Sequence, residues 1–252
     1  MDEGRCKMPD VCEYSLITKG DMYVYGKQTY SKIAAGGRVE PGGVAAGRGF
    51  NFGGYTRQIN GEVYYEQNGR IGRLCESTRT IKWNCAGGKT QKPLSELFDW
   101  SDFEWLAQHI KNSPLTEDLQ TSPVYQNGDG DDFVVRVYTQ GGRYTIDDIL
   151  HEYRGTASPP RGYDKGRTLA VFNTAEDILL TKDTESFGPS VLAPFSCVTL
   201  AGHAGYIDGF LVAKQFGKCN SYPDSADDVQ RNIFALQHHG DCYKGPIECT
   251  ST

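Results

Sequence analysis

The chain has 252 residues, 38% of them hydrophobic and 12% aromatic, a balance too apolar for a disordered protein. Its formal net charge is −6 and it has no cluster of Lys and Arg, so we expect no nucleic-acid partner, because phosphate binding needs a basic surface. No apolar run is long enough to cross a bilayer, so we expect no transmembrane segment.

The first third of the chain has the pattern of short β-strands separated by turns. Apolar and aromatic runs at residues 22–25 and 63–65 are interrupted by glycine pairs such as Gly36-Gly37 and Gly53-Gly54. Such short strands between turn residues predict stacked or sandwiched β structure.

One long amphipathic helix is expected after residue 100. Ser101 and Glu104 have the spacing of a capping box, in which each side chain binds the other's free backbone N–H. Pro114 would end the helix. The apolar positions fall at i, i+3, i+4 and i+7 and are Phe103, Leu106, Ala107 and Ile110. We therefore expect the helix to pack alongside the β structure.

The most informative pattern is a repeat of 20 residues in the second half. Apolar triplets at 171–173, 191–193 and 211–213 share this spacing, as do those at 178–180 and 198–200. A solenoid explains a constant period, because each coil returns the chain to the same face about 4.8 Å further along the axis. We therefore predict a mainly β fold, a right-handed β-solenoid (β-helix) of about 20 residues per coil. Val171, Val191 and Leu211 should stack as one column.

A single domain spanning residues 1–252 is expected, with a core at 18–223 and an extension at 224–252. Within the extension, residues 224–240 have the pattern of a second helix with Val229, Ile233 and Leu236 on one side. A disulfide loop should fix the end of the chain.

Eight cysteines indicate a disulfide framework and an oxidising compartment. The separations favour the pairs Cys6–Cys12, Cys75–Cys85, Cys197–Cys219 and Cys242–Cys249, among 105 arrangements. No CxxC occurs and no His lies at ligand spacing from a Cys pair, so the alternative of a zinc site is disfavoured. We therefore expect a disulfide-stabilised protein that is secreted or at the cell surface, with its leader removed.

A family resemblance enters at residues 188–214. The string resembles the choice-of-anchor A domain, an adhesive domain of microbial surface proteins, through Val191-Leu192-Ala193-Pro194, Ile207-Asp208-Gly209 and Ala213-Lys214. Residues 32–37 and the helix at 98–111 are similar to earlier parts of that family, and the likeness covers about residues 18–223. It implies extracellular attachment and an architecture similar to ice-binding β-solenoid proteins, and it supplies no catalytic residues.

Two groups of residues are candidate sites. Tyrosines crowd the first third and suit stacking on sugars or anchoring a protein partner, although packing against the core is the alternative that we favour; the candidates are Tyr23, Tyr25, Tyr55, Tyr64 and Tyr65. Asn127, Asp129 and Asp131 have the alternate spacing of a calcium loop. They lack its glycine and its final Glu, so an acidic turn is preferred over a Ca²⁺ site and no cofactor is expected.

No catalytic constellation is recognisable, because His151-Glu152 does not extend to HExxH and no GxSxG occurs. The sequence therefore predicts a non-catalytic extracellular binding or adhesion module that presents a solenoid surface to a glycan or protein. Ice binding is an alternative, although the aligned positions Asn173, Ala193 and Ala213 are irregular. A carbohydrate-active enzyme on a β-helix and a structural coat protein are further alternatives.

Overall fold

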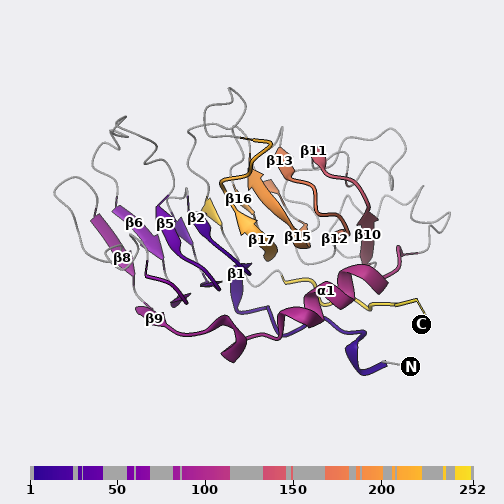
Figure 1. Cartoon of the computed structure of the whole chain (residues 1–252), viewed down its shortest axis with the longest axis horizontal. Helices are drawn as coiled ribbons and strands as arrows, with labels where there is room; N and C mark the ends of the chain where they lie inside the picture. Colours follow the sequence, from indigo (N-terminus) through magenta and orange to yellow (C-terminus); the bar gives the residue numbers. More distant parts are fainter. Residues whose placement is uncertain are drawn as a thin grey trace, which may run out of the picture.

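The computed structural model describes residues 3–24, 28–29, 31–41, 56–59, 61–68, 82–85, 87–113, 133–145, 149, 168–181, 186–187, 189–200, 206–207, 209–222, 235–236 and 242–250. The described part of the chain is mainly β, with the helix α1 and two sheets of parallel strands (Figure 1). Every pairing between the described strands is parallel, as the expected stacking of coils requires.

The elements of the N-terminal part are, in chain order, η1 (Glu3–Arg5), β1 (Tyr14–Thr18), β2 (Met22–Val24), β3 (Gln28–Thr29), β4 (Lys32–Ala35), β5 (Val39–Pro41), β6 (Thr56–Ile59), β7 (Val63–Tyr65), β8 (Lys82–Cys85), β9 (Lys89–Gln91), η3 (Leu94–Glu96) and α1 (Trp100–His109). The C-terminal part contains β10 (Val134–Tyr138), β11 (Gly142–Thr145), β12 (Thr168–Phe172), β13 (Ile178–Thr181), β14 (Ser186–Phe187), β15 (Ser190–Leu200), β16 (Tyr206–Ile207), β17 (Leu211–Phe216) and β18 (Ala235–Leu236).

A twelve-stranded sheet holds most of these strands, and its main path runs β10-β12-β15-β17-β1-β4-β7-β9. The C-terminal strands form one half of this path and the N-terminal strands form the other. They meet in the middle, where Leu16 of β1 lies opposite Leu211 of β17. A six-stranded sheet, β14-β16-β18-β3-β6-β8, repeats the arrangement, because β18 pairs with β3.

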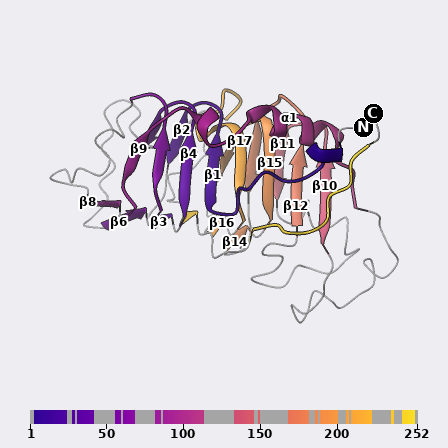
Figure 2. The same ribbon diagram turned by 90° about the horizontal axis from the view of Figure 1, so that it is seen from below.

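The two faces of the long sheet bury different clusters. One cluster contains Val191, Leu211, Leu16, Ile33 and Val63, which are consecutive neighbours across adjacent strands. The residues that follow them in each strand point to the opposite face and join a second cluster with the helix and the segments near the two ends of the chain. Figure 2 shows α1 lying across the strands in front of this second face.

Helix α1 has the predicted apolar stripe, but its cap differs from the prediction. Phe103, Leu106 and Ala107 are fully buried against the sheet, and burial of each larger side chain contributes about 2 kcal/mol. The N-cap is Asp99, whose carboxylate accepts a hydrogen bond from the Ser101 N–H at 3.0 Å. The predicted capping box was wrong because Ser101 lies inside the helix and Glu104 instead pairs with Lys19, the residue after β1, at 2.8 Å.

The 20-residue repeat holds for two strand pairs and fails for a third. Val191 lies opposite Leu211, and Ile178 lies opposite Val198, each with an offset of 20 residues. Val171, however, lies opposite Leu192, an offset of 21. This one-residue shift turns Val171 to the helix-covered face, so the predicted column of Val171, Val191 and Leu211 was wrong in its first member.

Other strand pairs have other offsets: 34 residues separate Val134 from its partner Thr168, and the offsets of the N-terminal half vary as well. Leu16 lies opposite Ile33, and Ile33 lies opposite Val63, so the same face is reached after 17 and then 30 residues.

The predicted second helix was wrong at Ala235–Leu236, which form strand β18, and residues 223–234 lie outside the described part of the chain.

Cys197–Cys219 is a disulfide, as predicted, but the two expected short loops at the chain ends do not form. Cys6 is bonded to Cys249, and Cys12 is bonded to Cys242. The pairs Cys6–Cys12 and Cys242–Cys249 were wrong because both chain ends return to the same face of the sheet, where each cysteine meets one from the other end. The proposed partner of Cys85, Cys75, lies outside the described residues.

Candidate binding surface

The predicted tyrosines do not form one site. Tyr65 is 7% exposed and belongs to the hydrophobic cluster on the sheet face that points away from α1, which leaves no ring face for a ligand. Its neighbour Tyr64 points to the opposite face of β7 and is half-buried. Tyr23 is also half-buried, but it lies on β2, with the ammonium of Lys218 4.9 Å from its ring centroid. Tyr25 and Tyr55 lie outside the described residues.

Tyr64 is the centre of a small aromatic and charged patch, which we call the Tyr64 surface. Its members come from strands β1, β4 and β7 and from the segments that precede β7 and follow β9; they are Tyr14, Lys32, Glu62, Tyr64 and Lys92. These strands are neighbours in the long sheet, which brings together residues that are far apart in sequence.

The aromatic rings of the Tyr64 surface are held by packing. The ring centroids of Tyr14 and Tyr64 are 6.2 Å apart, and Phe98 packs edge-on to Tyr14 at 5.0 Å. Tyr14 is 8% exposed and supports Tyr64 from below, while Tyr64 keeps part of its ring at the surface. A ring fixed in this way loses little conformational entropy when a ligand stacks on it.

Cations flank both rings. The Lys32 Nζ lies 5.9 Å from the Tyr14 ring centroid, and the Lys92 Nζ lies 5.6 Å from that of Tyr64. Each lysine also has an acidic partner: Lys32 contacts Glu13 at 2.5 Å and Lys92 contacts Glu96 at 3.5 Å. The positive charges of the patch are therefore locally balanced.

Hydrogen bonding and burial shift the ionisation of these groups. The Tyr64 hydroxyl donates to Glu62 at 2.5 Å, and this bond, with burial, raises the pKa of Tyr64 to about 12. Burial also raises the pKa of Tyr14. The bond to Glu13 raises the pKa of Lys32, so the patch carries neutral phenols and a charged ammonium at neutral pH.

The only cluster of candidate metal ligands in the described part of the chain is Asp177, Cys197 and Cys219. Its two sulfur atoms form a disulfide, so they are not available as thiolate ligands. The Asp177 carboxylate instead accepts a hydrogen bond from the Ser221 N–H at 2.7 Å. The predicted calcium ligands Asn127, Asp129 and Asp131 lie outside the described residues.

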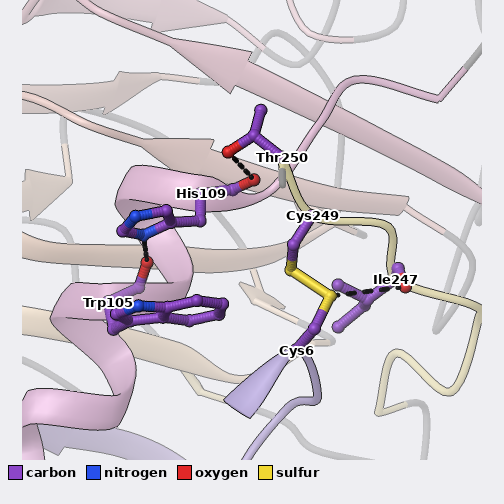
Figure 3. Close-up of a disulfide and its surroundings, with 6 residues drawn as sticks. All are labelled: Cys6, Trp105, His109, Ile247, Cys249 and Thr250. Carbon is purple, nitrogen blue, oxygen red and sulfur yellow. Dashed lines mark hydrogen bonds between the residues drawn. A yellow bond between two sulfur atoms is a disulfide. The ribbon is translucent and has the colours of Figure 1, made fainter. Parts of the chain in front are cut away.

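His109, the last residue of α1, packs against Trp105 of its own helix and is not part of the candidate binding surface. Its ring stacks on Trp105 with the centroids 4.3 Å apart, and its Nδ1 lies 2.8 Å from the Trp105 carbonyl oxygen (Figure 3). The guanidinium of Arg5 lies 5.6 Å from the Trp105 ring centroid. These contacts join the helix to the segment that carries Cys6.

Two of the three positions weighed for an ice-binding face are in the interior, and the third, Asn173, is half-buried. Ala193 lies opposite Ala213, as the 20-residue period predicted, but both are fully buried in the hydrophobic cluster on the sheet face that points away from α1. This position of the repeat therefore offers no surface to ice.

No family model, no curated protein and no solved structure matches this chain, so the resemblance to the choice-of-anchor A domain stays a prediction. Among the described residues, no helix has the length and apolar character needed to cross a membrane.

The sequence pointed to Tyr64 but missed the four residues around it. Tyr14, Lys32 and Lys92 come close to Tyr64 only through the registers of β1, β4, β7 and β9, whose offsets differ from one pair to the next. The pattern Glu-x-Tyr at 62–64 is the one local feature that indicates the pair, because alternate residues of a strand share a face.

Proposed function

We propose that this chain is a non-catalytic extracellular binding module, in which a β-solenoid scaffold presents the Tyr64 surface to a glycan or a protein. The observation that carries the proposal is the fixed, partly exposed ring of Tyr64 with Glu62 and Lys92 beside it on a disulfide-linked scaffold. Rings held in this way are common anchors in binding surfaces.

The solenoid part of the proposal is supported by the strand order. From β13 to β18 the chain alternates between the long and the short sheet, and each return to a sheet places a new strand parallel to another strand of it. A parallel neighbour reached by a crossover is almost always reached with right-handed sense. Stacked coils of this kind form a rigid support for surface residues.

Secretion is supported by the disulfides. Three are described, and two of them join segments near opposite ends of the chain. Such bonds form and persist in oxidising compartments. An attachment role outside the cell is also what the resemblance at residues 188–214 implies.

The charges favour an uncharged glycan over a polyanion. Lys32 and Lys92 are already paired with Glu13 and Glu96, and Glu62 accepts the hydrogen bond of Tyr64. A highly charged ligand would have to break these pairs, whereas a neutral sugar offers an apolar ring face to Tyr64 and hydroxyl groups to its neighbours.

Binding of the oxidised protein to arrays of neutral glycans, acidic glycans and proteins tests the proposal. We expect micromolar binding to a neutral glycan, a loss of at least tenfold in Tyr64→Ala, and a smaller loss in Tyr64→Phe, which keeps the ring. Tyr23→Ala is the matched control, because Tyr23 lies on β2 and outside the patch. Absence of binding, or an equal loss in Tyr23→Ala, would overturn the assignment, and binding only to proteins would redirect it to a protein ligand.

A further inference from the structure

The segments near the two ends of the chain meet and are joined covalently. The Cα atoms of Cys6 and Cys249 are 5.9 Å apart, although 243 residues separate them in sequence. This disulfide lies against the end of α1, where the Thr250 N–H donates to the His109 carbonyl at 2.7 Å and the Lys111 N–H donates to the Glu248 carbonyl at 2.8 Å. Figure 3 shows the Thr250 hydroxyl, which donates to the same His109 carbonyl at 3.3 Å. Any chain that enters before Cys6 and leaves after Cys249 therefore does so at one place.

A second bond lies directly inside the first. Cys12 and Cys242 are joined with their Cα atoms 5.2 Å apart, and their sequence separation is 230 residues. Both bonds therefore enclose nearly the whole fold, including every strand of the two sheets. Cys197–Cys219 differs from these two bonds, because it closes a loop with a sequence separation of only 22 residues, within the part of the chain that they enclose.

We propose that the domain transmits tension between the segments on either side of it without unfolding. A force applied between residue 5 and residue 250 passes from Cys6 through the disulfide to Cys249. The enclosed residues lie on a parallel path whose ends are held 5.9 Å apart, so they cannot extend while the bond is intact. The non-covalent contacts of the sheets are thereby spared the load.

The seam between β1 and β17 is what this arrangement protects. Without the two bonds, tension would reach β1 from the N-terminal side, and β18 and then β17 from the C-terminal side. Strands β1 and β17 are neighbours in the centre of the long sheet. Parallel strands held by backbone hydrogen bonds separate far below the force that breaks a covalent bond. The terminal disulfides, Cys6–Cys249 and Cys12–Cys242, thus carry the tension in place of the β1–β17 pairing, where the two halves of the sheet meet.

An ordinary stabilising role would also explain two disulfides, so the test must measure length rather than stability. Single-molecule pulling of the oxidised chain through handles at its two ends provides this measurement. For the wild type we expect no unfolding step at forces below covalent rupture. In Cys6→Ser/Cys249→Ser the load moves to Cys12–Cys242, and only segments 6–12 and 242–249 are released, a gain of roughly 45 Å.

Removal of both terminal disulfides should expose the fold to force. In the fourfold Cys→Ser variant we expect a step of roughly 700 Å, which is the interval between Cys12 and Cys242 less the loop held by Cys197–Cys219. Cys197→Ser/Cys219→Ser is the matched control, and its oxidised form should show no step. Because the fourfold variant needs to fold without its bonds, a dithiol reductant added to the stretched wild type serves as a second route, and its release is longer by the loop that Cys197–Cys219 held.

A step of hundreds of ångströms in the oxidised wild type would overturn the proposal, as would an unchanged length after reduction. The measurement contains no ligand, so its failure leaves the Tyr64 surface untouched. Conversely, loss of glycan binding in Tyr64→Ala has no bearing on the path of the force.

Discussion

Leu16 of β1 lies opposite Leu211 of β17 in adjacent parallel strands, and both side chains are fully buried in one cluster. These two residues are 195 positions apart in a sequence of 252. The long sheet is therefore completed at its centre, where its N-terminal and C-terminal halves meet.

Truncation of Leu16 should weaken this seam strongly. Leu16→Ala leaves a cavity between Ile33 and Leu211, and we expect a loss of about 3 kcal/mol in the free energy of unfolding. Chemical denaturation followed by circular dichroism measures it. The exposed helix residue Gln108 is the control, and Gln108→Ala should change stability by less than about 0.5 kcal/mol. Equal effects of the two substitutions would contradict the buried seam.

The terminal disulfides should act non-additively. While Cys6–Cys249 is intact, Cys12–Cys242 restricts only two short segments of the unfolded chain, so its removal should cost about 3 kcal/mol. Removal of both frees an interval of more than 200 residues and should cost about 8 kcal/mol. Denaturation of the two double variants and the fourfold variant under non-reducing conditions measures the cycle; strictly additive losses would contradict nested closure.

Glu62 should control the ionisation of Tyr64. The pKa of Tyr64 is raised from 10.0 to about 12, and its hydrogen bond to Glu62 is the largest cause. Since the native state favours the neutral phenol, the associated stability is present below pH 10 and is lost as the pH rises from 10 towards 12. In Glu62→Gln the pKa of Tyr64 should fall towards 10. NMR titration of ¹³Cζ-labelled tyrosine measures it, with Tyr243 as the internal control because burial alone raises its pKa to about 12.

Asp99, rather than Ser101, should be the residue that caps α1. Asp99→Ala removes the acceptor for the Ser101 N–H and should lower the melting temperature more than Ser101→Ala. Hydrogen bonding from Ser101 lowers the pKa of Asp99 below 3.8, so the cap contributes above that pH and is lost as the pH falls through the lowered value. The difference between Asp99→Ala and the wild type should therefore shrink as the pH falls below 3.8; a constant difference would contradict a charged cap.

Local patterns in the sequence predicted the individual helices and strands better than they predicted which residues face each other in neighbouring strands. The apolar stripe of α1 and the offset of 20 between β15 and β17 follow from spacing that the sequence contains. The position of Val171 does not, because one extra residue before β15 moves it to the other face. A strand that is buried on both faces has apolar residues at consecutive positions, so its sequence does not show which residues lie on which face.

The disulfides and the binding patch were missed for a related reason. Cys6 and Cys12 are near each other in sequence, but their bonds are decided by where the other end of the chain lies. Glu62 and Tyr64 share a strand face and were accessible to sequence reasoning, whereas Lys32 joins them only through the register of β4 with β7. Both depend on the order of strands in the sheet, which local spacing does not specify.

The pairing of the terminal cysteines is the most direct test of the arrangement in which the two ends of the chain are locked together. Protease digestion under non-reducing conditions, followed by mass spectrometry, identifies each linked pair of peptides. We predict that the peptide with Cys6 is linked to the one with Cys249, and that Cys12 is linked to Cys242. Recovery of Cys6–Cys12 and Cys242–Cys249 instead would contradict the account.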